Sequence, residues 1–185
     1  MKPPAPRIIA GKWKGQPIET PRTAGTRPTS ARTREALFSM LASRLGSFED
    51  LTVADIFAGS GALGFEALSR GARTCFFVEN NADALAAIRN NARSWDVSAQ
   101  ITVLNRSFDS EAQIPETVDL AFFDPPYSSG DGPRALARLD ELSWFAPHAW
   151  AALETAAQEE VSVSGWTADA TRNHGKAKLT LLRRN

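Results

Sequence analysis

From residue 52 to residue 124 the chain alternates short apolar runs with longer segments in which apolar residues recur every three or four positions. The short runs predict buried β-strands and the longer periodicity predicts amphipathic helices. Strands are expected at 52–57, 74–79, 101–104 and 118–124, with helices from a glycine-rich loop to Gly71 and over 82–95. This alternation is typical of right-handed βαβ units, which form a parallel sheet with helices on both faces.

The N-terminal part of the chain departs from this alternation. Segments 7–10 and 16–19 predict two short strands joined by a glycine-flanked loop that exposes Lys12, Trp13 and Lys14. A helix is then expected, because Thr29 or Ser30 can cap its start and Gly46 can end it. Its apolar face would consist of Leu37, Met40, Leu41 and Leu45.

The last third of the chain predicts strands at 149–154, 160–163 and 178–183. The last two have no helical crossover between them, so an antiparallel hairpin is expected to finish the sheet. The predicted fold class is therefore α/β, a doubly wound and mostly parallel Rossmann-like sheet. It carries an antiparallel C-terminal hairpin and a small N-terminal appendage of β-hairpin plus helix.

Length and composition fit one domain with a short extension. The 185 residues are 43% hydrophobic, which is enough for one sizeable core. We expect a main domain at 29–185 and a basic tail and hairpin at 1–28. No apolar run approaches the roughly 20 residues that cross a bilayer, and the single cysteine and two isolated histidines lack metal-ligand spacing. A cytoplasmic monomer without membrane or metal is predicted.

The net charge of zero conceals a segregation of charge along the chain. Eight basic residues and one acidic residue precede Glu35, whereas the remainder carries 13 basic and 20 acidic residues. A basic arm on an acidic body is expected where one part of a protein contacts nucleic-acid phosphates. By composition alone, an ordinary solvated basic tail is an equal alternative.

A G-x-G-x-x-G sequence, Gly59 to Gly64, stands where the first strand of the sheet meets a helix. This context is typical of nucleotide-cofactor sites, and Glu79 ends the next strand at the distance from which a carboxylate reaches ribose hydroxyls. These features fit NAD, FAD or S-adenosylmethionine alike. Asp55 favours S-adenosylmethionine, because its carboxylate suits a methionine ammonium and is unfavourable beside a pyrophosphate. The alternative is that Asp55 only caps the loop.

The apolar run 118–123 leads directly into Asp124-Pro125-Pro126-Tyr127. Open α/β sheets bind ligands at the carboxyl ends of their strands. Successive prolines restrict the backbone, so the Asp124 carboxylate and nearby carbonyls can stay aimed at one point. Hydrogen bonds to both hydrogens of an exocyclic amine would orient its nitrogen lone pair toward a donor methyl group, and Tyr127 could stack on an extruded base.

Asp-Pro-Pro-Tyr matches the (Asn/Asp/Ser)-Pro-Pro-(Tyr/Phe) motif, and with the glycine loop it resembles class I methyltransferases that act on amino groups. The chain from Arg7 to about Arg184 resembles the RsmD family of bacterial 16S ribosomal RNA guanine-N2 methyltransferases. The matching segments are Arg7-Ile-Ile-Ala-Gly-Lys-Trp-Lys-Gly15, Arg27-Pro-Thr29, Arg32-Thr-Arg34-Glu-Ala-Leu-Phe38 and Phe57-Ala-Gly-Ser-Gly-Ala-Leu-Gly64.

The resemblance implies S-adenosylmethionine as cofactor and 16S ribosomal RNA, or the small ribosomal subunit, as partner. It implies catalytic roles for Asp124, Pro125, Pro126 and Tyr127. The expected cofactor-binding residues are Asp55, Phe57, Gly59, Ser60, Gly61, Glu79, Asn80, Asn105, Arg106 and Asp124. The expected RNA-binding residues are Lys12, Trp13, Lys14, Arg27, Arg32 and Arg34. The third strand lacks the aspartate that many methyltransferases use to read adenine, so Asn105 or backbone atoms would serve.

Two other functions fit parts of the sequence. DNA adenine-N6 and cytosine-N4 methyltransferases share the Asp-Pro-Pro-Tyr motif, but they usually carry a sizeable target-recognition segment, for which this chain has little room. A non-catalytic RNA-binding assembly factor on a degenerate methyltransferase fold would keep the basic arm. The intact Asp124 and Gly59 argue against it.

Overall fold

A computed structural model describes residues 5–21, 30–110, 113–126 and 129–185. Its centre is a seven-stranded sheet in the order β3-β2-β1-β4-β5-β7-β6. The strands are β1 (Thr52–Ile56), β2 (Thr74–Glu79), β3 (Ile101–Asn105), β4 (Val118–Phe123), β5 (Phe145–Ala156), β6 (Trp166–His174) and β7 (Ala177–Arg184). Strands β1 to β5 pair in parallel, and β7 pairs antiparallel with both β5 and β6. The predicted mostly parallel sheet with an antiparallel C-terminal hairpin is confirmed.

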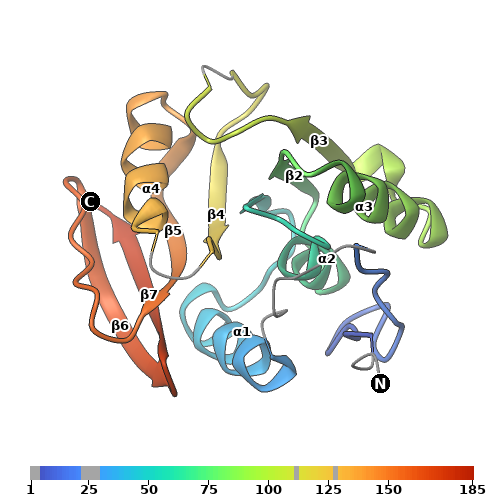
Figure 1. Cartoon of the computed structure of the whole chain (residues 1–185), viewed down its shortest axis with the longest axis horizontal. Coiled ribbons are helices and arrows are strands. Elements are labelled where there is room, and N and C mark those ends of the chain that lie inside the picture. Colours follow the sequence, from blue (N-terminus) through green and yellow to red (C-terminus); the bar gives the residue numbers. More distant parts are fainter. Residues whose placement is uncertain (1–4, 22–29, 111–112, 127–128) are drawn as a thin grey trace.

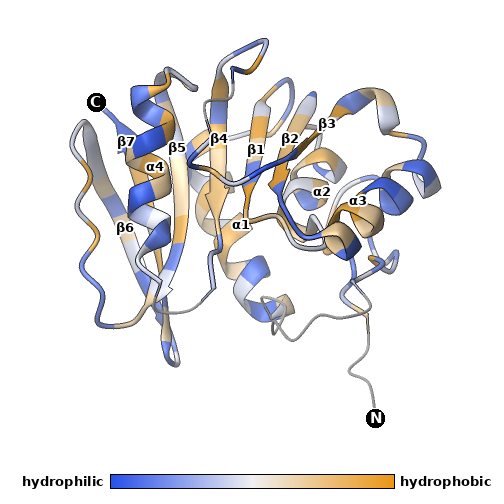
Figure 2. Ribbon diagram, turned by 45° about the horizontal axis from the view of Figure 1, so that its top comes forward, coloured by the Kyte–Doolittle hydropathy of each residue, from blue (hydrophilic) through white to orange (hydrophobic). Residues whose placement is uncertain are grey.

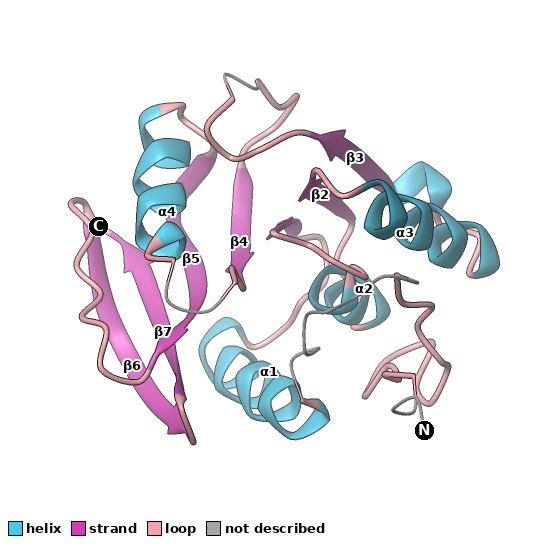
Figure 3. Cartoon of the chain, in the orientation of Figure 1, coloured by secondary structure: helices cyan, strands magenta, loops and turns pink. Residues whose placement is uncertain are grey.

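Helices cover both faces of this sheet, as the βαβ alternation predicts (Figures 1 and 3). They are α1 (Ala31–Leu45), α2 (Ala62–Ser69), α3 (Ala82–Ser94) and α4 (Asp131–Glu141), with a short 3-10 turn η1 (Ser98–Gln100). Ser30 caps α1 by accepting a hydrogen bond from the Thr33 amide, and Gly46 ends it with φ 72°. Both predicted ends of this helix are confirmed.

The core is divided by the sheet into two apolar layers. Helices α1, α2 and α3 pack against one face, which contains Phe77 and Phe122. Helix α4 packs against the other face, which contains Phe76 and Phe123. The inner strands are apolar almost throughout (Figure 2), as expected for parallel strands buried on both sides. Within the described ranges, no helix is long and apolar enough to span a bilayer.

Two elements of the C-terminal half differ from the sequence prediction. The expected strand at 160–163 is wrong, because the first strand of the hairpin is β6. Helix α4 was not predicted, since Gly132 and Pro133 stand within its first turn. Proline is tolerated there because first-turn amides have no helical partner, and the apolar face of the helix then covers β4 and β5.

The N-terminal segment 5–21 forms a hairpin, which we call the N-terminal hairpin. The strands predicted at 7–10 and 16–19 are not regular strands, because a single isolated ladder pair joins Arg7 and Pro17. The Ile8 amide donates to the Gln16 carbonyl at 3.0 Å, while the amides of Ile9 and Ala10 donate to the Glu66 carboxylate on α2 at 2.7 and 3.0 Å. The hairpin therefore packs beside α2 and α3, far from β6 and β7 (Figure 1).

Candidate active site

The candidate site lies where the strand order reverses, between β1 and β4. These two strands are neighbours in the sheet, and their last register pair joins Ile56 to Phe123. The glycine loop therefore leaves β1 directly beside the point at which Asp124 leaves β4. Such reversal points create crevices at the carboxyl ends of strands in open α/β sheets. The topology thus brings together two motifs that are more than 60 residues apart in sequence.

The glycine loop owes its shape to packing and backbone angles. Gly59 and Gly61 have φ values of 55° and 77°, a region that favours glycine. A Cβ at Gly61 would lie 2.8 Å from the Phe65 ring, and one at Gly64 would lie 2.4 Å from the Phe77 ring. A Cβ at Gly59 would meet nothing within 4 Å. Gly61 and Gly64 are therefore required by the fold, while Gly59 borders open space that a ligand could use.

Phe57, the residue that follows β1, also has a left-handed backbone, with φ 64°. A bulky side chain in this conformation costs about 1–3 kcal/mol and persists where its surroundings fix it. The Phe57 ring packs edge-on against Phe108, with ring centroids 5.3 Å apart. This contact fixes the first residue of the glycine loop.

Asp55 lies at the centre of the site and is almost fully buried, with 2% of its surface exposed. Its Oδ2 accepts a hydrogen bond from the Gly64 amide at 2.9 Å, so it does cap the start of α2. Burial raises the pKa of Asp55 well above its usual value; the Gly64 hydrogen bond opposes this, while the nearby charges of Asp124 and Glu79 raise the pKa further. A cation beside these three carboxylates would be stabilised.

Glu79, at the end of β2, connects the glycine loop to the neighbouring strand. Its Oε2 accepts a hydrogen bond from the Gly59 amide at 2.8 Å, and its Oε1 accepts from the amides of Asn80 and Asn81, each at 2.8 Å. The sequence predicted a ligand contact for this carboxylate but not this structural role. Both carboxylate oxygens already orient the backbone that borders the candidate cofactor site.

The end of β3 supplies the other candidate cofactor residues. Asn105 is exposed and is the register partner of Glu79. The Arg106 amide donates to the Glu79 carbonyl at 3.1 Å. Ser60 is half-buried, and its carbonyl accepts a 3.4 Å hydrogen bond from Asn91, a buried α3 residue that the sequence reading did not single out. The structure thus gathers these residues around one loop, and their cofactor contacts stay predictions.

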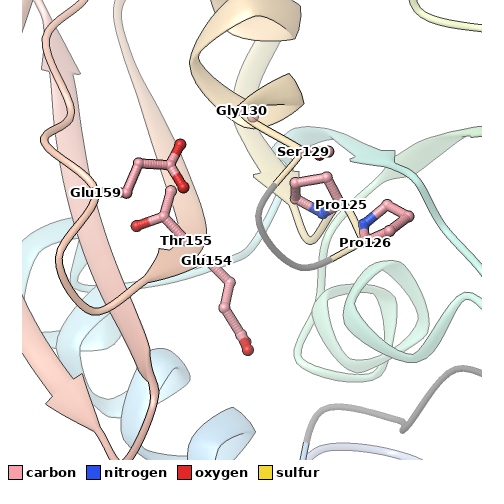
Figure 4. Close-up of a pocket in the computed structure, with 8 residues that line it drawn as sticks. Pro125, Pro126, Ser129, Gly130, Glu154, Thr155 and Glu159 are labelled. Atoms are coloured by element: carbon pink, nitrogen blue, oxygen red, sulfur yellow. The ribbon is translucent and has the colours of Figure 1, made fainter.

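The Asp-Pro-Pro segment borders a small cleft (Figure 4). Asp124 and Pro125 are half-buried and Pro126 is exposed, while Tyr127 lies outside the described residues. The cleft is lined by Pro125, Pro126, Ser129, Gly130, Gly132, Glu154, Thr155 and Glu159. Glu154 was missed by the sequence reading. The only signal for it was a carboxylate at the end of the apolar run 149–153.

Trp13 is not the exposed stacking surface that the sequence predicted. Only 8% of its surface is exposed, and its ring stacks on Trp95 at 5.1 Å with an interplanar angle of 16°. The Lys12 ammonium lies 4.3 Å from the centroid of the Trp13 ring. Gln16 accepts a hydrogen bond from the Trp95 indole at 2.8 Å. The predicted exposure is wrong because Trp95, directly after α3, offers Trp13 an aromatic partner, whereas Lys12 and Lys14 are exposed.

Arg34 is also buried, with 1% of its surface exposed, so it is absent from the surface that the predicted RNA contact requires. Its Nη2 donates to the Arg7 carbonyl at 2.7 Å. Burial lowers the pKa of Arg34, and the nearby Glu66 carboxylate opposes that change. Arg34 therefore anchors the N-terminal hairpin to α1. Arg32 is exposed, and Arg27 lies outside the described residues.

Metal-ligating side chains do not gather in the described part of the chain. No group of three or more His, Cys, Asp or Glu residues there could hold a metal ion. Cys75 is buried in β2.

Known proteins resemble this chain over nearly its full length. The family model described as conserved hypothetical protein 95 matches residues 6–183. Ribosomal RNA small subunit methyltransferase D of Haemophilus influenzae is 35% identical over 87% of this chain and 84% of its own length. The Escherichia coli protein of the same name is 32% identical over 96% and 89%.

The fold agrees with these sequence matches. The solved structure of yhhF from Escherichia coli superimposes with a TM-score of 0.83 at 30% identity, covering 97% of each chain. This agreement confirms the class I methyltransferase fold predicted from the glycine loop and the strand alternation. The chain therefore belongs to the ribosomal RNA small subunit methyltransferase D family.

Proposed function

We propose that this protein transfers a methyl group from S-adenosylmethionine to the exocyclic N2 amine of a guanine in 16S ribosomal RNA. The observation that carries the proposal is the placement of Asp124 beside Asp55 and the glycine loop, at the reversal of strand order. The names of the relatives support a substrate in the small ribosomal subunit. The Asp-Pro-Pro-Tyr motif supports an amine as the acceptor.

The residues at the glycine loop fit S-adenosylmethionine. Open space borders Gly59, where a Cβ would meet nothing. The three neighbouring carboxylates of Asp55, Glu79 and Asp124 suit a ligand with positive charge, and S-adenosylmethionine carries both an ammonium and a sulfonium. We assign the ammonium to Asp55, the ribose to Glu79 and the adenine end to Asn105 and Arg106. When bound, the cofactor supplies an electrophilic methyl group.

Asp124 is the residue that we assign to the acceptor amine. Its carboxylate accepts one N–H of the amine and a neighbouring backbone carbonyl accepts the other, so the nitrogen lone pair points toward the methyl group. Pro125 and Pro126 hold these acceptors in place by restricting the backbone. After transfer, the Asp124 carboxylate can receive the proton that the methylated nitrogen releases. Tyr127 is proposed to stack on the extruded base.

The N-terminal hairpin is proposed to contact RNA through Lys12 and Lys14, which are exposed on a segment anchored at several points to α2 and α3. Arg32 at the start of α1 is exposed as well and can extend this surface. Rigid anchoring suits such contacts, because an RNA-binding surface that is already ordered loses little conformational entropy on binding.

The proposal is tested by methyl transfer to small ribosomal subunits purified from a strain that lacks the enzyme. The protein is incubated with methyl-labelled S-adenosylmethionine and these subunits, and the RNA is digested to nucleosides. The expected product is labelled N2-methylguanosine. Subunits from a strain that contains the enzyme are the matched control and should accept little label, since their target is already methylated.

The same digest separates the alternatives. Label on adenine N6 or cytosine N4 would contradict guanine N2 as the acceptor. Calorimetry that detects no binding of S-adenosylmethionine would instead support a non-catalytic assembly factor. Cofactor binding without label on either subunits or free ribosomal RNA would overturn the substrate assignment.

A further inference from the structure

Glu154 is a buried carboxylate next to the Asp-Pro-Pro segment. Its exposed fraction is 8%, and it lines the same cleft as Pro125 and Pro126. The last register pair between β4 and β5 joins Phe123 to Leu153. Asp124 directly follows β4 and Glu154 follows Leu153 within β5, so the two acids come next after this register pair on neighbouring strands. Neighbouring strands are about 4.8 Å apart.

The two acids also belong to the same face of the sheet. Side chains alternate between faces along a strand, so Asp124 shares a face with Phe122, and Glu154 shares a face with Ala152. Phe122 and Ala152 pack in the same apolar layer, the one covered by α1 and α2. The Glu154 side chain accordingly points away from Thr155 and Glu159 (Figure 4).

A base whose amine is bound by Asp124 would therefore also meet the carboxylate of Glu154 on the neighbouring strand β5. In guanine, the ring nitrogen N1 is bonded to the carbon that carries the N2 amine, and it bears a hydrogen. In adenine and cytosine, the ring nitrogen next to the exocyclic amine carries a lone pair instead. A carboxylate only accepts hydrogen bonds, so it favours guanine and repels the other two bases at this position.

We propose that Glu154 is the residue that selects guanine, by accepting a hydrogen bond from N1–H while Asp124 holds the N2 amine. This inference rests on the proposed function and names a specificity determinant within it. Enzymes read extruded bases through hydrogen bonds to the Watson–Crick edge. A site that contains a buried hydrogen-bonding group strongly rejects a substrate that leaves this group unpaired.

The test uses an RNA that carries the methylated guanine and a second RNA with 2-aminopurine at that position. 2-Aminopurine keeps the N2 amine but has a lone pair on N1. We expect kcat/KM of the unmodified protein to be at least about tenfold higher for guanine than for 2-aminopurine, since a hydrogen bond to a charged group contributes about 1.5–3 kcal/mol.

Glu154→Gln should shift this preference, because an amide can donate a hydrogen bond to the N1 lone pair. We expect the ratio of the 2-aminopurine rate to the guanine rate to rise at least about tenfold, with cofactor affinity and Tm retained. Glu159→Gln is the matched control, because it removes a carboxylate from the same cleft without changing the face that carries Asp124. It should keep the original ratio.

An unchanged ratio in Glu154→Gln, with both rates intact or both reduced equally, would overturn the inference, because a purely structural role lowers both rates together. If Glu154→Gln does not fold, the test uses the unmodified protein alone. Equal kcat/KM values on the guanine RNA and the 2-aminopurine RNA would then overturn the inference. Failure of the proposed function is distinct, since the unmodified protein would then place no methyl group on guanine N2.

Discussion

The carboxyl ends of β1 and β4 and the N-terminal hairpin both contain residues that the sequence marks as functional, but they use their polar groups differently. At the strand ends, the carboxylates of Asp55 and Asp124 lie close together; burial keeps the pKa of Asp55 high, and the nearby Asp124 charge raises it further. In the hairpin, backbone amides pair with Glu66 and Ser69, and Trp13 packs on Trp95. The first region brings like charges close together, and the second uses most of its polar groups for anchoring.

Residue type alone therefore does not separate a binding residue from an anchoring one. Arginine and tryptophan are common in RNA-binding surfaces, yet Arg34 and Trp13 are buried here, where the Arg7 carbonyl and the Trp95 ring are their partners. At the strand ends, the carboxylates of Asp55, Glu79 and Asp124 instead lie near one another. Their like charges repel one another, and a positively charged ligand would relieve this repulsion.

The largest expected effect concerns the anchor of the hairpin. Glu66 is fully buried and binds the amides of Ile9 and Ala10 and the Arg70 side chain, close to the buried Arg34. Glu66→Ala should lower the free energy of unfolding by about 3–5 kcal/mol, because it leaves the Ile9 and Ala10 amides without their acceptor and breaks the ion pair with Arg70. Urea unfolding measures this loss.

Glu160→Ala is the control for Glu66→Ala, since Glu160 is exposed and its loss should change the stability by less than about 0.5 kcal/mol. A loss of under about 1 kcal/mol in Glu66→Ala would contradict the anchoring role.

An intermediate effect concerns pH and the cofactor. Burial raises the pKa of Asp55 in the free protein, and an ammonium beside the carboxylate would lower it. Binding then releases a proton between the two pKa values, so cofactor affinity should rise with pH there by up to about tenfold per pH unit. Asp55→Asn should bind more weakly and lose this dependence. Calorimetry at several pH values measures this pH dependence of cofactor affinity. A wild-type affinity that falls with rising pH across this window would contradict the assignment of the ammonium to Asp55.

The smallest expected effect concerns the exposed face of the hairpin. Replacing Lys12 and Lys14 together by alanine should make the plot of log affinity for ribosomal RNA against log salt concentration shallower by about 1.4–1.8, because two phosphate contacts are lost. Trp13→Phe is the matched control and should leave this slope unchanged, since it keeps both charges. An unchanged slope in the double variant would show that these lysines do not contact phosphate.

Much of the fold follows from the sequence because its signals are local. The buried strands β1, β2 and β4 appear as apolar runs, and the glycines at 59, 61 and 64 mark the turn into α2. Helix α4 escaped prediction because Gly132 and Pro133 obscure its start. Its stability depends on packing against β4 and β5, which no local pattern reveals.

The candidate site was predictable where one motif supplies several residues, as in Asp124 to Pro126. Glu154 was not predictable, because its relation to Asp124 depends on which strand pairs with β4 and in what register. Arg34 and Trp13 were misassigned for a similar reason: their partners are 27 and 82 residues away in sequence, and only the folded chain brings them together.

The central claim is that Asp124 acts on the acceptor amine, while Asp55 and the glycine loop hold the cofactor. It is tested most directly by measuring single-turnover methyl transfer and cofactor affinity in the same Asp124→Ala protein. The claim predicts that transfer slows by at least about a hundredfold while the affinity for S-adenosylmethionine stays nearly unchanged. Loss of both in equal proportion, or transfer at the wild-type rate, would contradict it.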